Sequence, residues 1–341
     1  MTRGILALDD ERARLALRRP PLVAVVLVAV SLGLVVVGTC VGATGWEPLW
    51  SSDPVASSIL WEIRLPRSLG AWLAGAMLGL AGAVAQGLFR NPLADPYLLG
   101  SATGASFGVA MLLLLLGASP AGATAWWASL GLAGGGFVGA LGAVLVTLVL
   151  ARGVQETLRL LLAGVVVGMV FGALTSLVML GSPEVLRAMQ GFLLGTTGFL
   201  GWNGVALLAV VLAVLAVAAV VLSPGLDALA LGEATARSLG VPLQALRMGL
   251  VAVMALATGA AVAQVGLVAF IGLVAPHLVR AAALPTHRWL LPLAALAGGV
   301  LLLAADVGAR WLLAPQELPV GVLTALLGGG YLLWLMHRRL P

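Results

Sequence analysis

The sequence predicts an all-α, polytopic membrane protein with about ten transmembrane helices. Hydrophobic side chains make up 61% of its 341 residues and charged side chains only 9%, whereas soluble domains carry about 25% charged residues. Apolar runs of about 20 residues, which can cross the hydrocarbon core as a helix, recur along the whole chain. The 45 glycines suit helices that pack closely in lipid. A β-barrel would instead show alternating segments of about ten residues.

Residues 1–20 are polar and rich in arginine, and we expect them to form an uncleaved cytoplasmic tail. A cleaved signal peptide is the competing interpretation, but its charged and apolar regions would both be shorter. Residues 21–337 then form a single membrane domain without a long linker or a low-complexity segment. We place its spans at about 21–44, 66–88, 94–116, 126–150, 159–180, 199–222, 244–264, 266–283, 289–309 and 318–336.

The arginines orient these spans. With ten spans and the N-terminus inside, 14 of the 18 arginines fall on the cytoplasmic side and four on the outside. This asymmetry agrees with the positive-inside rule. Both termini and the polar segment 227–241 are therefore expected in the cytoplasm. The external arginines are Arg64, Arg67, Arg187 and Arg310.

The composition also excludes several kinds of chemistry. The chain has no lysine, so it can hold neither a P-loop ATPase site nor a lysine Schiff base. A single cysteine excludes an internal disulfide, and the three histidines lie too far apart for a metal-binding motif. We therefore predict no catalytic residue and no metal site. The high pI reflects arginines that hold the cytoplasmic face, and it does not indicate a nucleic-acid partner.

Two motifs lie at the predicted outer face. IRLPR at 63–67 places Arg64 and Arg67 at the edge of the second span, and Arg310 follows Asp306 at the i, i+4 spacing of a helical ion pair. Ordinary snorkelling would explain these arginines, and a structural ion pair would explain Asp306. Arginine forks at an outer face also suit carboxylates on a soluble partner. Glu317, which precedes a Leu-Pro helix start, adds a second acidic group nearby.

Two further motifs interrupt helices. In RNPLADPYLLG at 90–100, two Asx-Pro pairs break the chain between spans two and three. It is either a plain loop or a segment that re-enters the protein, because non-helical backbone at membrane depth must be buried or line a cavity. In GLVAFIGLVAPHLVR at 266–280, Pro276 kinks or ends a helix. His277 has no second ligand at helical spacing, which favours a structural role over proton transfer or metal binding.

The polar segment 227–241, DALALGEATARSLGV, is too short and too polar to span a membrane. The SPG sequence at 223–225 precedes it and predicts a helix break. We expect a pair of short helices at the cytoplasmic membrane face, available to a partner outside the lipid.

Seven stretches that follow one another along the chain resemble the FecCD/BtuC family, the permease subunits of type II ABC importers for metal chelates. The resemblance runs from about residue 60 to the C-terminus. This chain departs from the family at 328–330, where it has three glycines in place of Gly-x-Pro, and at Leu158, where small polar gate residues can occur. The stretches are IRLPR (63–67), AGAMLGLAGAVAQGLFRNPLADPYLLGSATGA (74–105), LLLAGVVVG (160–168), LALGEATARSLGV (229–241), VAFIGLVAPHLVR (268–280), ADVGAR (305–310) and ELPVGVLTALLGG (317–329).

The resemblance implies a permease in the bacterial inner membrane that pairs with a second copy of itself or with a close homologue. Two cytoplasmic ABC ATPase subunits would bind ATP and Mg, while this chain would bind no cofactor. A periplasmic or lipoprotein binding protein would deliver the substrate, and the fifth and last spans would line its path.

The same resemblance assigns roles to individual residues. The segment 227–241 would form the coupling helices, which insert into a cleft of the ATPase through Gly232, Glu233, Ala236, Arg237, Leu239 and Gly240. The outer arginines Arg64, Arg67 and Arg310 would dock the binding protein. The cytoplasmic gate would include Asn91, Leu93 and Thr157.

The sequence leaves the substrate open. By family frequency we expect an iron–siderophore or haem, with cobalamin (vitamin B12) as the alternative. A secondary transporter driven by an ion gradient is a rival of another class, because broken helices and ionisable residues occur there too. Charged residues of this chain cluster at the predicted span ends, which argues against an ion relay at mid-span.

Overall fold

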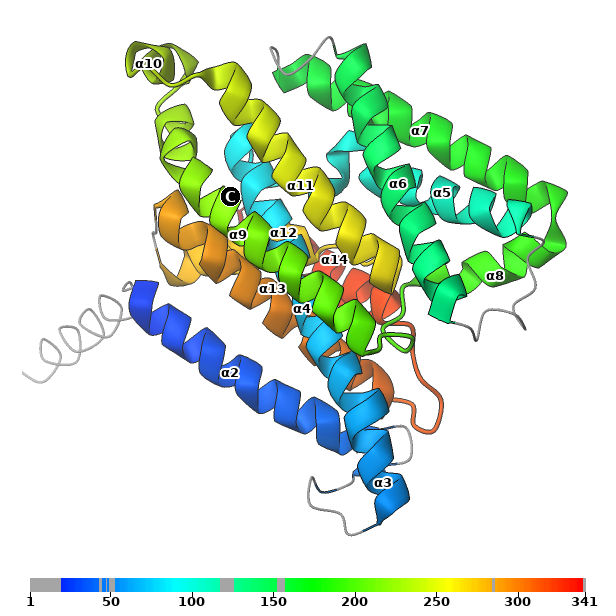
Figure 1. Cartoon of the computed structure of the whole chain (residues 1–341). Helices are drawn as coiled ribbons and strands as arrows, with labels where there is room; N and C mark the ends of the chain where they lie inside the picture. Colours follow the sequence, from blue (N-terminus) through cyan, green and yellow to red (C-terminus); the bar gives the residue numbers. More distant parts are fainter. Residues whose placement is uncertain are drawn as a thin grey trace, which may run out of the picture.

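The computed structural model describes residues 20–42, 45–46, 48, 53–116, 126–151, 157–283 and 286–339. The described residues form a helical bundle, which confirms the all-α prediction (Figure 1). The strands within these ranges are a two-residue pair at one end of the bundle, β1 (Val41–Gly42) and β2 (Gly45–Trp46).

The described helices follow in chain order. They are α2 (Pro20–Cys40), α3 (Pro54–Ile59), the π-helix η1 (Leu60–Arg64), α4 (Leu65–Phe89), the 3₁₀ turn η2 (Pro96–Leu99), α5 (Ser101–Leu115), α6 (Trp126–Leu150), α7 (Thr157–Gly181), α8 (Pro183–Leu194), α9 (Trp202–Ala230), α10 (Glu233–Ser238), α11 (Leu243–Val265), α12 (Ile271–Ala282), α13 (His287–Trp311) and α14 (Val320–Arg339).

Ten apolar helices occupy the ten predicted spans. Among the described residues, seven are long and apolar enough to cross a membrane by themselves, and the other three, in α5, α12 and α14, are apolar helices of 10 to 17 residues. Each short helix follows a segment of non-helical backbone. The predicted number of spans is therefore consistent with the fold, although three of them are only partly helical.

Several predicted boundaries are wrong for physical reasons. The span predicted at 94–116 starts as a helix only at Ser101, because the Asp95 side chain caps a 3₁₀ turn that begins at Pro96. The span predicted at 266–283 is helical only from Ile271, since Gly266 and Phe270 both adopt positive φ values. The second span extends upstream of residue 66, because α3 and η1 continue directly into α4.

The predicted break at 223–225 is also wrong. Helix α9 continues through Pro224 to Ala230, so α10 is the one separate short helix in the segment 227–241. Pro224 has no N–H for the carbonyl of Val220, but the Ser223 hydroxyl donates to that carbonyl at 2.7 Å. Because this bond satisfies the exposed acceptor, the helix tolerates the proline.

Helix α8 was not predicted. The Ser182 hydroxyl caps it by accepting from the N–H of Val185, and Pro183 occupies its first turn. Only Val185 and Met189 of this helix are buried. The Ser-Pro-Glu sequence at 182–184 is a helix-start signal that could have revealed it.

Helix α4 forms the centre of the bundle and packs against α9, α11, α12 and α13 (Figure 1). Glycines bring α4 and α13 into backbone contact. A Cβ on Gly75 would lie 2.4 Å from the carbonyl oxygen of Gly298, and one on Gly79 would lie 2.1 Å from that of Ala294. Small residues at such crossings let helices pack closely where lipid removes the usual hydrophobic driving force.

Replacing Gly79 with alanine is expected to destabilise the protein by about 1–3 kcal/mol, because the new methyl group must push the α13 backbone away. Thermal unfolding of the purified protein in detergent measures the loss. Gly142→Ala on α6 is the matched control, since nothing lies within 4 Å of its Cβ position. Equal unfolding temperatures for the two variants would contradict the close contact.

Candidate functional site

A buried carboxylate organises the predicted outer end of the bundle. Asp306 on α13 has no exposed surface. It accepts from Nε and Nη2 of Arg67 at 3.2 and 3.1 Å, from Nη2 of Arg310 at 2.6 Å, and from the Thr197 hydroxyl. The predicted i, i+4 pair of Asp306 with Arg310 is therefore present, and it belongs to a larger network that joins α4, α13 and the segment before α9.

Arg310 and Arg64 also hold backbone carbonyls. Arg310 donates to the carbonyls of Gly38 and Val41 at 2.7 and 3.1 Å. Arg64 donates to the carbonyl of Cys40 at 3.0 Å. These bonds fix the end of α2, and the side chains of Arg64, Arg67 and Arg310 are buried within the chain. The three predicted docking residues thus lie together, and each has partners inside this chain.

Glu317 completes the outer cluster from the side of α14. Its carboxylate accepts from Nη1 of Arg67 at 2.8 and 3.1 Å. The Glu317 side chain is 37% exposed, while Asp306 is fully enclosed. Arg67 therefore has one guanidinium edge on a buried acid and the other on an acid that reaches solvent.

A second charged cluster surrounds Glu233 at the opposite end of the bundle, where Figure 1 places α10 far from α3. The Glu233 carboxylate pairs with Arg247 of α11, and Arg90 and Arg237 each lie 3.7 Å away. All three arginines were assigned to the cytoplasmic side by the positive-inside rule. They therefore lie at one end of the bundle, as the predicted topology requires, and which side of the membrane that end faces stays a prediction.

The short helix α10 presents an exposed face. Gly232 and Gly240 flank it with φ values of +106° and +78°, which non-glycine residues rarely adopt. Ala236 packs inward, while Arg237 and Leu239 are exposed. The residues predicted to couple to an ATPase therefore lie together in one turn-helix-turn unit, and the contact with an ATPase itself stays a prediction.

The predicted gate begins where α4 ends. Arg90 caps α4 in a left-handed conformation with φ +50°. The Asn91 side chain then accepts from the N–H of Leu93 at 2.9 Å, and Leu93 is exposed. Thr157 starts α7, but its side chain lies outside the described part of the structure. Because Arg90 also approaches Glu233, the coupling unit and the start of the predicted gate are joined by an ion pair.

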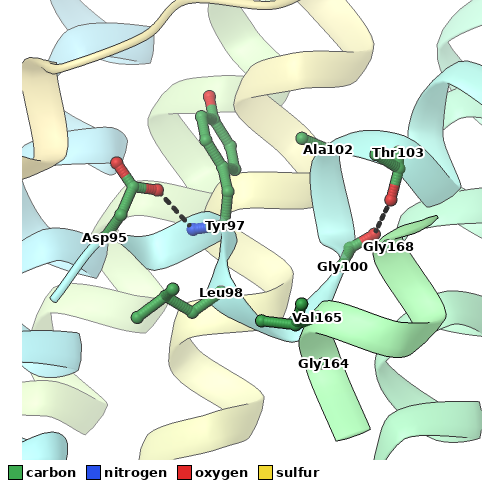
Figure 2. Close-up of a pocket in the computed structure, with 9 residues that line it drawn as sticks. All are labelled: Asp95, Tyr97, Leu98, Gly100, Ala102, Thr103, Gly164, Val165 and Gly168. Atoms are coloured by element: carbon green, nitrogen blue, oxygen red, sulfur yellow. Dashed lines mark hydrogen bonds between the residues drawn. The ribbon is translucent and has the colours of Figure 1, made fainter. Parts of the chain in front are cut away.

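A cavity of about 330 Å³ adjoins α7, the fifth predicted span (Figure 2). The 3₁₀ turn η2 and the start of α5 form one wall, and α7 forms the other. The turn sits close to α7, because a Cβ on Gly164 would lie 2.0 Å from the carbonyl oxygen of Leu98. The cavity is lined by Asp95, Tyr97, Leu98, Gly100, Ala102, Thr103, Gly164, Val165 and Gly168.

The non-helical segments meet inside the bundle. The Tyr97 hydroxyl in η2 donates to the carbonyl of Val268 at 3.0 Å. The N–H of Leu267 donates to the carbonyl of Phe192 at 2.9 Å, and a Cβ on Gly321 would lie 2.5 Å from the carbonyl oxygen of Leu267. Residues 94–100 therefore re-enter the protein, whereas residues 90–93 are exposed. Within 94–100 the N–H groups of Ala94, Tyr97, Leu98 and Gly100 bond to partners in the chain, as membrane depth requires.

Sequence reasoning missed several members of these clusters. Arg90 and Arg247 were treated only as topology markers, and Thr197 was not considered. Arg90 directly precedes the Asn-Pro motif, so its position offered a signal. Arg247 lies 14 residues from Glu233 on another helix, and no local spacing reveals that pairing.

Comparisons with known proteins agree with this architecture. The model of the FecCD transport family matches residues 15–338. The chain is 42% identical over 304 residues to a vitamin B12 import system permease protein BtuC of Escherichia coli O17:K52:H18, which covers 88% of this chain and 90% of the relative. It is also 44% identical over 283 residues to BtuC of Salmonella paratyphi A. That alignment covers 82% of this chain and 83% of the relative.

A solved structure extends the similarity to the fold. It is an inward-facing transporter assigned to the metal-chelate type of ABC transporter. The TM-score is 0.81 at 28% identity, and the alignment covers 94% of this chain and 100% of that one.

Asp306→Asn is expected to destabilise the protein by about 3–5 kcal/mol, because it leaves Arg67 and Arg310 buried without their shared charge. Thermal unfolding in detergent tests this. Glu317→Gln is the control, and its cost is expected to be about 1 kcal/mol or less, since the pair it breaks is partly exposed. A mild effect of Asp306→Asn would mean that Asp306 does not hold this end together.

Glu233→Gln is expected to speed amide hydrogen exchange in residues 90–94, because it removes the charge that Arg90 approaches. Hydrogen-exchange mass spectrometry of the protein in nanodiscs measures this. Arg288→Gln is the matched control, because it removes an exposed charge at the start of α13, at the same end of the bundle, that forms no ion pair with Glu233 among the described residues. The predicted link between α10 and the gate fails if both variants exchange like the unmodified protein.

Proposed function

Because the chain belongs to the FecCD transport family, we propose that it is the permease subunit of an ATP-driven importer in the bacterial inner membrane and that its cargo is vitamin B12. The family makes it a multi-pass transport subunit rather than an enzyme. ATP hydrolysis would be carried out by two separate ATPase subunits.

The identity with BtuC proteins carries the choice of cargo. It is 42–44% over 82–88% of this chain. We expected an iron–siderophore or haem from family frequency, and the relatives favour the alternative, cobalamin. The similarity to a transporter of the metal-chelate type supports the class but does not point to iron.

The geometry supports different roles for the two ends of the bundle, with ATPase coupling at the end that carries α10. The exposed face of α10 would receive the ATPase, and the Glu233 cluster would pass its motion to α11 and to the end of α4. The exchange between inward- and outward-facing states would then be a rigid-body change between packings. The cavity beside α7 supports the proposal that this helix lines the path, together with α14 of the last span.

The outer arginines support a partner with acidic side chains. Carboxylates are the groups that guanidinium forks bind best. We therefore place a periplasmic or lipoprotein binding protein on the end that carries Arg64, Arg67 and Arg310. A second copy of the permease would complete the path.

The rival secondary transporter needs an ion relay at mid-span. The buried charged side chains among the described residues instead belong to the two end clusters. Asp306 lies five residues before the end of α13, and Arg247 lies four residues after the start of α11. Charge in these positions suits anchoring and docking better than ion coupling.

Proteoliposomes containing the permease, its ATPase and its binding protein test the proposal. We expect uptake of cobalamin with ATP and none with a non-hydrolysable analogue, because the permease has no P-loop of its own. Ferric siderophore and haem are the comparison cargoes under the same conditions. ATP-dependent uptake of an iron chelate alone would refute the choice of cargo. Uptake that follows an imposed ion gradient instead of ATP would refute the class.

A further inference from the structure

The outer cluster raises a physical problem for docking, because its arginines already have partners. Arg310 uses its guanidinium on Asp306, Ser68 and the carbonyls of Gly38 and Val41. Arg64 donates to the carbonyl of Cys40. Breaking these bonds would leave buried carbonyls without donors, which costs about 1–3 kcal/mol for each group.

Arg67 is different, because its two edges face different surroundings. Nε and Nη2 hold Asp306, which is fully buried. Among the described residues Nη1 bonds to Glu317 alone, and the Glu317 side chain is 37% exposed. A carboxylate that reaches solvent can leave this edge and be hydrated, whereas Asp306 cannot. The Nη1 edge is therefore the part of the outer cluster that a new carboxylate can take.

The occupied edges of Arg67 make this an exchange and not an addition. Asp306 accepts from Nε and Nη2 of Arg67, and Glu317 accepts from Nη1 with both carboxylate oxygens. A third carboxylate at Arg67 would meet Glu317 at close range, and like charges at that distance repel. The incoming acid must displace Glu317 from Nη1.

We propose that Glu317 is an internal stand-in for an acidic side chain of the binding protein, holding Arg67 until docking exchanges one carboxylate for the other. This inference rests on the proposed docking function of the outer arginines. It assigns Arg67 as the arginine whose partner changes and Arg64 and Arg310 as residues that position the site.

The exchange would also reach the proposed path. Glu317 is followed directly by Leu318 and Pro319, and α14 begins at Val320. The N–H of Leu318 donates to the carbonyl of Ala309 at 3.0 Å, so this segment is held on α13 next to Arg310. Displacing Glu317 removes the ion pair that ties the start of α14 to α4. Docking would thereby free the start of α14, a helix proposed to line the path, from its ion pair with α4.

The proposal predicts that removing the charge of one interface side chain, Glu317, tightens binding instead of weakening it. Glu317→Gln should strengthen binding of the binding protein to the permease–ATPase complex in nanodiscs by about two- to fivefold, because Arg67 no longer has to release an ionised partner. Glu62→Gln is the matched control. It removes an exposed acid five residues before Arg67, and its carboxylate makes no ion pair among the described residues. We expect it to change the Kd much less.

A double-mutant cycle isolates the exchange. With Arg67→Gln present, Glu317→Gln should no longer tighten binding, because the two groups act through each other. The proposal that Glu317 is exchanged would be overturned if Glu317→Gln weakened binding or left it unchanged. It would also be overturned if Glu317→Gln and Glu62→Gln tightened binding equally. Equal binding by the unmodified protein and Arg67→Gln would overturn docking at Arg67 itself. Cobalamin uptake would still test the proposed function separately.

A second measurement needs no partner. Phenylglyoxal modifies accessible guanidinium groups, and mass spectrometry locates the product. Labelling of Arg67 should rise in Glu317→Gln and stay at the unmodified level in Glu62→Gln. Unchanged labelling of Arg67 in both variants would contradict an exchangeable edge.

Discussion

The close crossing of α4 and α13 is the constraint on which the rest of this structure depends. Gly75 and Gly79 on one helix and Gly298 on the other bring the two backbones into contact. Hydrophobic side chains gain little by leaving lipid for a protein interior, so such contacts depend on close packing. The crossing fixes α4 at the centre, and α9, α11 and α12 then pack around it.

Because α4 is fixed, its two ends define the two charged clusters. Arg67 stands in its first turn and Arg90 caps its last. The outer cluster is enclosed around Asp306 and ties α2, α4 and α13 together, whereas the Glu233 cluster lies among partly exposed groups. Enclosed networks are rigid, and partly exposed ion pairs can rearrange at small cost. The end predicted to be cytoplasmic is thus the more adaptable of the two, and the partly exposed Glu317 is the exception at the opposite end.

Hydropathy predicted the number and order of the spans, because lipid imposes the same requirement on each. It could not predict that α5 and α12 start late. The segment before Ile271 is as apolar as the helix itself, but Gly266 with positive φ caps α11, and Phe270 with positive φ directly precedes α12. Family resemblance grouped Arg64, Arg67 and Arg310 correctly at one end. It could not reveal their internal partners, since Asp306 lies 239 residues from Arg67 in the chain.

The non-helical segments explain how a bundle held by backbone contact can also change shape. Continuous helices bond within themselves, so they move as rods. The segments before α5 and α12 instead bond to other parts of the chain: the Tyr97 hydroxyl donates to the carbonyl of Val268, and the Leu267 N–H donates to the carbonyl of Phe192 near the end of α8. If one of these segments moves slightly, the segment bonded to it must move as well or the bond breaks. The Tyr97 bond therefore couples the starts of α5 and α12 beside the fixed pair α4 and α13, and Tyr97 also lines the cavity against α7.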